Sequence, residues 1–348
     1  MEHRRQDPGA QFFLTAASVV IVVAGLKVAS ELLRPFVVSL FLAIVSLPVL
    51  HWLRRRGLPM ALAVLITVLL VLAILLFLLA VVGGSVASFS ERAPEYWGQI
   101  QSFADQLEEA LVERGFPRES VALRKLINAP AVMDFFTGTV AAIAKTVSRT
   151  TLVLLTMVFI FLEAAGFGDK LRAAFPGTTG FRRFSRILQE VQEYLVIKTL
   201  ISLATGLLLG LWCAFWGLDF YALWGLLAFA LNYIPNIGSI LAAVPPVVLA
   251  LIQGGFGQGL AIGIGFLTVN MLLGNFLEPN LMGRRLGLSP LVVLMSLAFW
   301  GWVWGPVGML LSVPLTMVLK ILFENTEDLR WLATLLGENP PPAGSLPE

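Results

Sequence analysis

The sequence predicts an all-α polytopic membrane protein with about eight hydrophobic segments. The 348 residues are 57% hydrophobic and only 13% charged, with a mean hydropathy of +0.85, whereas soluble domains carry about 25% charged residues. Several apolar runs reach the roughly 20 residues that a helix needs to cross a bilayer. Two more apolar segments are broken in their middles by proline and glycine.

Six continuous apolar runs are expected to be membrane spans. They are 12–29, 35–53, 59–87, 150–166, 194–217 and the glycine-rich 256–278. The first run follows Arg4 and Arg5, as the apolar region of a signal peptide would. It lacks a convincing small-residue cleavage site, so we interpret it as a span that is retained.

Lys and Arg in short loops set the expected orientation, because such loops favour the cytoplasm. The loop Leu53–Gly57 holds three arginines, and the connector 167–192 holds five basic residues. Both agree with a cytoplasmic N-terminus. The polar segment from Ser88 to Ser148 is then external, and the spacing of Ile100, Phe103, Leu107 and Leu111 predicts an amphipathic helix within it. Its role is open between a functional lid and a tolerated surface excursion.

Three smaller patterns predict packing and anchoring. An apolar stripe at 184–195 is typical of an interfacial helix that leads into the next span. Gly206 and Gly210 fit a close helix–helix contact. The tryptophans at 300, 302 and 304 suit an interfacial aromatic belt, although a solute-stacking set has the same pattern.

The two broken segments are 221–252 and 290–323. The first is interrupted at Asn232–Ser239 and the second at Trp304–Gly308, and in both cases proline removes a backbone donor while glycine permits irregular dihedrals. Arms of roughly 13 to 17 residues are about 20–26 Å long, which is short of the roughly 30 Å hydrocarbon core. Each broken segment follows a long span, so a span-plus-broken-segment unit occurs twice.

Two topologies fit these segments. If both cross fully, the loop Glu278–Arg285 faces outside with its two arginines, against the positive-inside rule. If both are re-entrant hairpins, that loop is cytoplasmic and the two units form an inverted repeat. We prefer the hairpins, because they explain both the short arms and the position of the arginines.

Irregular backbone at membrane depth lines protein or a wet cavity, where it can bind an ion or a polar solute. Glu278 is a carboxylate near the inner end of its span, and such groups are proton or cation candidates; capping or pairing with Arg284 or Arg285 is the alternative. Glu163 is a weaker candidate of the same kind. The predicted substrate- or ion-binding residues are Asn232, Pro235, Asn236, Gly238, Ser239, Asn270, Asn275, Glu278, Gly305, Pro306 and Gly308.

The sequence resembles the autoinducer-2 exporter (AI-2E) family of bacterial membrane proteins over nearly the whole chain, most strongly from 194 to 323. The motifs are Tyr233–Gly238, Glu278–Pro279 with Gly283, Leu288–Pro290, and Gly305–Gly308 through Pro314. The resemblance implies several spans, an extracytoplasmic insertion after the third, oligomeric assembly, and export of autoinducer-2 or sodium(lithium)/proton antiport. Trp300–Trp302 is bulkier than the glycine-rich stretch expected there.

The first functional hypothesis is a secondary transporter for a small polar solute or a monovalent cation, working by alternating access. A channel and a non-transporting scaffold acting through 88–149 are the alternatives. GxxxxGK[ST], HExxH and GxSxG motifs are absent from the sequence, so no direct use of ATP and no enzyme activity are expected. A homo-oligomer in the bacterial inner membrane, with both termini cytoplasmic, is expected instead.

No cofactor beyond a coupling H⁺ or Na⁺, no metal and no nucleic-acid partner are predicted. Cys213 is the single cysteine, and the net charge is +2. The expected organisation begins with a scaffold of three spans (1–87), an external insertion (88–149) and a fourth span with its connector (150–192). A transport core (193–323) and a tail whose end is disordered (324–348) follow.

Overall fold

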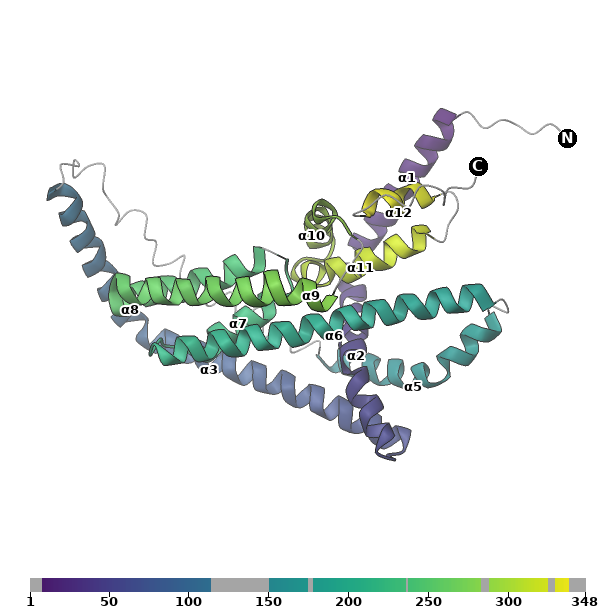
Figure 1. The fold of residues 1–348 in the computed structure, drawn as a ribbon, viewed down its shortest axis with the longest axis horizontal. Helices are drawn as coiled ribbons and strands as arrows, with labels where there is room; N and C mark the ends of the chain where they lie inside the picture. The colour runs from purple at the N-terminus through teal and green to yellow at the C-terminus, as the bar shows by residue number, and fades with distance from the viewer. Residues whose placement is uncertain are drawn as a thin grey trace. The chain divides into compact units, whose positions relative to one another are not determined.

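The computed structural model describes residues 8–113, 150–174, 178–235, 237–282, 288–324 and 329–337, and every regular element among them is helical (Figure 1). The elements are α1 (Pro8–Val28), α2 (Ser30–Arg55), α3 (Met60–Glu113), α5 (Thr150–Ala174), α6 (Thr178–Phe215), α7 (Tyr221–Leu231), α8 (Ile237–Val269), the π-helix η3 (Asn270–Leu277), α9 (Glu278–Met282), α10 (Pro290–Trp304), α11 (Pro306–Glu324) and α12 (Arg330–Leu336).

The chain divides into two compact units, which are described separately. The α6 unit consists of Val45–Leu154 and Gln192–Arg285. The α10 unit consists of Met1–Ile44, Leu155–Val191 and Leu286–Glu348. The predicted core, 193–323, contributes residues to both units, and its bounds stay a prediction.

Apolar composition confirms an α-helical membrane protein. Four helical stretches are long and apolar enough to cross a bilayer, namely Ser30–Arg55, Met60–Phe89, Gln189–Phe215 and Ile237–Leu281, and four shorter apolar helices accompany them among the described residues. Leu207, Leu211 and Phe215 of α6 are 58%, 66% and 79% exposed. Such side chains suit contact with lipid rather than water. The number of crossings and their orientation stay predictions.

Two stretches that lie between or before the predicted spans are helical. One residue, Ala29, separates α1 from α2, and Leu33 N–H still bonds to its carbonyl. Arg34 donates to Ser30 one turn earlier through Nη2, whereas its Nε is buried without a hydrogen-bond partner. Likewise α6 runs unbroken from Thr178, so the expected interfacial helix is continuous with its span.

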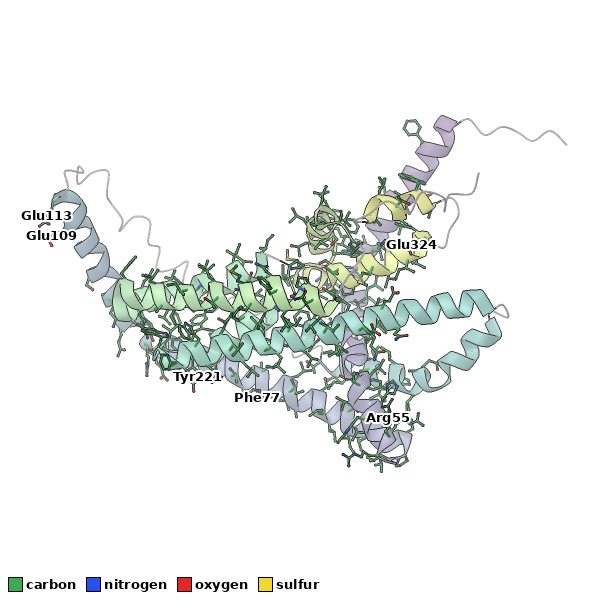
Figure 2. All side chains as sticks on the ribbon, in the orientation of Figure 1. Arg55, Phe77, Glu109, Glu113, Tyr221 and Glu324 are labelled. Carbon is green, nitrogen blue, oxygen red and sulfur yellow. The ribbon has the colours of Figure 1, made fainter. Side chains whose placement is uncertain are left out.

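Helix α3 extends beyond its apolar part into the expected external segment. Phe77 lies within the apolar part, and Glu109 and Glu113 lie at the far end of the helix (Figure 2). The expectation of a helix after residue 88 is therefore confirmed as far as Glu113. The side chains of Ile100, Phe103, Leu107 and Leu111, residues 114–149 and the tail end 338–348 lie outside what the structure describes.

Both predicted breaks are confirmed. The first lies between α7 and α8, where a Cβ on Gly238 would come within 1.8 Å of the Leu231 carbonyl oxygen. The second lies between α10 and α11 at Gly305, whose φ of 66° favours glycine. A Cβ on Gly308 would come within 1.9 Å of the Trp300 carbonyl oxygen. In each case the glycine lets the second arm touch the backbone of the first.

Helix α8 folds back on itself at Gly255, whose φ is 72° and ψ is −167°. After the turn, Gly259 faces Leu251 and Gly263 faces Val247. The indole N–H of Trp212 in α6 donates to the Ala261 carbonyl at 3.1 Å. The second half of α8 therefore runs antiparallel to the first half and alongside α6.

Helices α6 and α7 cross through glycines, which confirms the packing role predicted for Gly206 and Gly210. A Cβ on Gly225 would lie 2.7 Å from the Gly206 carbonyl oxygen and 3.0 Å from the Gly210 Cα. Such small residues let two backbones approach closely. Cys213, Trp224 and Phe266 then share one buried core with residues of α3.

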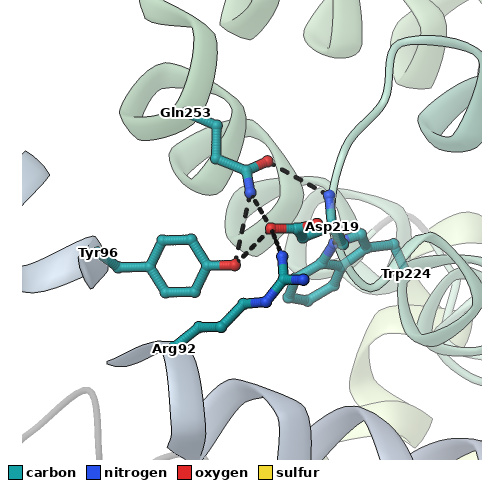
Figure 3. A network of polar contacts seen from close by, with 5 residues as sticks. All are labelled: Arg92, Tyr96, Asp219, Trp224 and Gln253. Atoms are coloured by element: carbon teal, nitrogen blue, oxygen red, sulfur yellow. Dashed lines mark hydrogen bonds and ion pairs between the residues drawn. The ribbon is translucent and has the colours of Figure 1, made fainter. Parts of the chain in front are cut away.

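A polar network at one end of the α6 unit joins three segments (Figure 3). Its centre is Asp219, in the loop between α6 and α7. The carboxylate accepts hydrogen bonds from Arg92 at 2.8 Å, from Tyr96 at 2.6 Å and from Gln253. Gln253 Oε1 also accepts the Asp219 backbone N–H at 3.3 Å. Because Gln253 precedes the Gly255 turn, the start of α7 and the end of the first half of α8 are held together.

The network also shifts two pKa values. Burial, reinforced by the hydrogen bond to Asp219, raises the pKa of Tyr96 to about 12. Burial opposes ionisation of Asp219, but hydrogen bonds from Tyr96 and Arg92 outweigh it and hold the pKa of Asp219 below its ordinary value of 3.8.

Replacing Asp219 by Asn should lower the melting temperature in a pH-dependent way. A depressed native pKa contributes stability above the ordinary value of 3.8, and that stability is lost as pH falls through the native pKa. The Tm difference between wild type and Asp219→Asn should therefore be full at pH 7 and shrink below 3.8. Differential scanning fluorimetry of the full chain in detergent measures it. The exposed control Glu95→Gln should stay near wild type, and a gap that persists at the lowest pH would contradict the assignment.

Candidate functional site

One face of α6 carries polar groups inside an apolar span. Tyr194, Lys198 and Ser202 recur every four residues, which places them along one side of the helix. All three are buried, and Ser202 is 0% exposed. Polar groups inside a span need partners, because no water is there to satisfy them.

The first break supplies two of those partners. Asn232 Nδ2 donates to Ser202 Oγ at 2.9 Å, and the Tyr233 hydroxyl donates to Thr199 Oγ1 at 2.8 Å. Thr199 in turn donates to the Leu195 carbonyl at 2.6 Å. Two consecutive residues of the break are therefore fixed to one turn of α6.

Lys198 supplies the charge at the centre of the site. Its Nζ lies 2.6 Å from Glu278 Oε1, and the two side chains are 4% and 19% exposed. The partners come from helices 80 residues apart in the chain. A buried charge is stable only when it is paired and hydrogen-bonded, so each of these groups supplies the partner that the other needs.

A π-helix positions Glu278. The Glu278 N–H bonds to the Leu273 carbonyl, five residues earlier, as in the other turns of η3. This wide register is rare and often occurs at functional sites. Glu278 then begins α9, where it is the acidic residue of the first turn.

The site lies near the middle of the α6 span. The apolar stretch Gln189–Phe215 has Ser202 at its midpoint. Lys198 is four residues away, about 6 Å along the axis at 1.5 Å per residue. The first break therefore lies beside the centre of a span. That span ends at Phe215, and Asp219 and Gln253 meet beyond its end.

The structure brings only part of the predicted set together. Asn232 and Glu278 contact the same face of α6, at Ser202 and Lys198. Pro235 and Ser239 are half-buried beside the break and Gly238 is fully buried there, whereas Asn236 lies outside the described residues. Asn270, half-buried, and Asn275, exposed, stand at the start and in the second half of η3. The functional roles of all these residues stay predictions.

Gly305, Pro306 and Gly308 belong to the α10 unit, where tryptophans secure the second break. Trp300 Nε1 donates to Thr316 Oγ1 at 3.1 Å, and Trp304 Nε1 donates to the Leu26 carbonyl of α1 at 3.2 Å. Trp302 is 57% exposed, with the Lys27 ammonium 3.4 Å from its ring centroid. Trp300 and Trp304 thus pack inside the protein rather than forming a belt, and Trp302 alone keeps an outward position.

The other candidate carboxylate, Glu163, has a different environment. It pairs with Lys170 at 2.6 Å, with the two side chains 58% and 66% exposed. Exposed pairs of this kind contribute little. Glu163 therefore lacks the burial that makes Glu278 unusual.

Sequence reasoning missed Lys198, Thr199, Ser202 and Tyr233. The run 194–217 is predicted above only as a span, and its one lysine is not among the candidate residues. A signal was present, because an ionisable residue inside a span marks a functional site by default. The partner of that lysine could not be read from local spacing.

The arrangement gathers the kinds of group that bind an ion or a polar solute. It offers a carboxylate, an ammonium, hydroxyls and an amide within a few turns of helix. Among the described residues, no cluster of three or more His, Cys, Asp or Glu side chains could hold a metal ion. The contacts within the site are an ion pair and hydrogen bonds.

Comparison with known proteins finds one family model and several similar proteins, all of them described as transporters or transport proteins. A family model described as AI-2E family transporter matches residues 16–328. The chain is 38% identical to the AI-2 transport protein TqsA of Escherichia coli over 331 residues, covering 95% of this chain and 96% of that protein. It is 37% identical to a candidate transport protein of Haemophilus influenzae, covering 93% and 95%, and 36% identical to the candidate transport protein YhhT of Escherichia coli, covering 96% of each.

Glu278→Gln should destabilise the protein strongly, because it leaves the Lys198 ammonium buried and unpaired. Breaking a buried pair by removing one partner costs about 3 kcal/mol or more. Glu163→Gln breaks an exposed pair of the same length and should cost less than about 1 kcal/mol. SDS titration of the purified chain in mixed micelles, followed by circular dichroism, compares the two. Equal losses would show that the Lys198–Glu278 contact is not a buried pair in the folded protein.

Proposed function

Because the chain belongs to the AI-2E family of transporters, we propose that it is a secondary transporter that moves a small polar solute or a monovalent cation across the bacterial inner membrane. Its relatives are named as transport proteins, and its apolar helices make it a multi-pass membrane protein. The solute class includes autoinducer-2-like signals, in keeping with the name of TqsA. Coupling to H⁺ or Na⁺ and assembly as a homo-oligomer are parts of the same proposal.

The observation that carries this proposal is the position of the first break. Asn232 and Tyr233 bind α6 at the middle of its span, next to the Lys198–Glu278 pair. Transporters bind substrate near the bilayer midplane, typically where helices are discontinuous. The break and the end of the π-helix are two departures from regular helix, and both contact α6 near its midpoint, where the ion pair forms.

We propose that the first broken segment is a re-entrant hairpin. The start of α7 and the end of the first half of α8 meet at Asp219 and Gln253, beyond one end of the α6 span. The tip between these arms meets α6 at its midpoint. A hairpin that enters and leaves on one side accounts for both contacts, and it supports the inverted-repeat topology preferred from the sequence.

The second broken segment has a comparable internal form. Gly301 lies against Met309 across the bend, and the Ser289 N–H before α10 donates to the Leu336 carbonyl of α12, which packs on α11. The end of this segment that lies opposite the bend is therefore next to α12. This supports a second hairpin, and alternating access would follow if the two tips expose the site to each side in turn.

A flux assay in vesicles tests the proposed function. Proteoliposomes of the full chain should release entrapped autoinducer-2, or collapse a proton gradient on addition of Na⁺ or Li⁺, with saturable kinetics. Asn232→Ala and Pro235→Ala should reduce that flux at least 10-fold, because they alter the break beside the site, while circular dichroism stays unchanged.

Gly83→Ala is the matched control, since a Cβ there has no atom within 4 Å. It should keep wild-type flux. Folded protein that moves none of these probes faster than protein-free vesicles would overturn the proposal, and flux that never saturates would favour a channel.

A further inference from the structure

We propose that Lys198 is a tethered counter-cation, which occupies the Glu278 carboxylate until a small monovalent cation displaces it. The inference rests on the proposed function and narrows it, because it makes a cation one of the species that the site binds. It also gives separate roles to two residues that form one ion pair. Glu278 is the binding group, and Lys198 sets how strongly a cation can compete for it.

The pair is built in a way that permits exchange. The ammonium and the carboxylate are 2.6 Å apart and mostly buried. Lysine carries its charge on a flexible stem of four carbons, so the ammonium can withdraw while α6 stays in place. Glu278 is the more exposed partner, at 19% against 4%, so cation entry is proposed on the Glu278 side of the pair.

Groups that suit a cation lie on and beside the turns of α6 next to Lys198. Thr199, Ser202 and Tyr233 bring hydroxyl oxygens to the same turns of α6. Helix α7 ends at Leu231, and the C-terminal end of a helix favours positive charge. Half-helix ends and interrupted backbone are the groups that coordinate transported cations in other transporter folds.

Competition for one carboxylate has a consequence that a structural ion pair lacks. Removal of the lysine charge should strengthen cation binding, whereas removal of the carboxylate should abolish it. A pair that only stabilises the fold would lose stability in both variants and respond to cations in neither.

Thermal unfolding of the full chain in detergent tests the inference. Melting temperatures are measured against NaCl and LiCl, with choline chloride holding the ionic strength constant. Lys198→Gln should respond to Na⁺ or Li⁺ at a concentration at least 10-fold lower than wild type, because the competitor is gone. Glu278→Gln and the double variant should not respond. Lys170→Gln, which breaks the exposed pair with Glu163, should respond as wild type does.

The inference is overturned if Lys198→Gln responds no more strongly than wild type, or if Glu278→Gln still responds. Should Lys198→Gln not be recovered folded, Glu278→Asp replaces it, since it keeps both charges but shortens the carboxylate arm by one methylene. That variant should respond more strongly than wild type, and an equal response overturns the inference.

The outcome is distinguishable from that of the flux assay. Release of autoinducer-2 by a protein whose variants ignore cations would overturn the inference and leave transport standing. Strong cation binding by Lys198→Gln, with no flux of any probe in vesicles, would contradict the proposed function instead.

Discussion

The buried contact between Lys198 and Glu278 is the constraint on which the rest of the α6 unit depends. Neither charge is stable alone inside an apolar span, so α6 and the end of η3 must meet at this depth. The π-helix and the return of α8 at Gly255 bring Glu278 to that point. The glycine crossing of α6 and α7 then lets the first break approach the same face. Each irregularity is costly by itself, and together they satisfy one pair of charges and one set of hydroxyls.

The open end and the tip of the first broken segment are held by different kinds of contact. At its open end, Asp219 accepts hydrogen bonds from Arg92 and Tyr96 of α3 and from Gln253 of α8. At its tip, Asn232 donates to Ser202 and Tyr233 donates to Thr199, and both acceptors are hydroxyls of α6. Neutral hydrogen bonds of this kind are weaker than those to a carboxylate. The contacts of the tip with α6 are therefore easier to exchange than the contacts at Asp219, which suits a binding site.

Much of the fold could be predicted, because its signals are local. Pro235 with Gly238 and Gly305 with Pro306 indicated both breaks, and Gly206 with Gly210 indicated a close helix crossing. The site was only half predicted: Asn232 and Glu278 were named, but Lys198 was not, since its partner lies 80 residues away. The register of η3 and the one-residue junction at Ala29 could not be predicted either, because the apolar periodicity of neither segment distinguishes it from an ordinary helix.

The proposed site beside Lys198 requires that the first broken segment enters and leaves on one side of the membrane, and thiol labelling measures this. Single cysteines at Tyr221, Gly257 and Arg56 would be introduced in a Cys213→Ala background and treated with a membrane-impermeant reagent in right-side-out and inverted vesicles. Tyr221 precedes the break, Gly257 follows the return of α8, and Arg56 lies in the turn between α2 and α3. Labelling at 221 and 257 from the outside, with 56 from the inside, is the predicted result. Labelling of 221 and 257 from opposite sides would mean that the segment crosses fully, and the proposed site beside Lys198 would lose its basis.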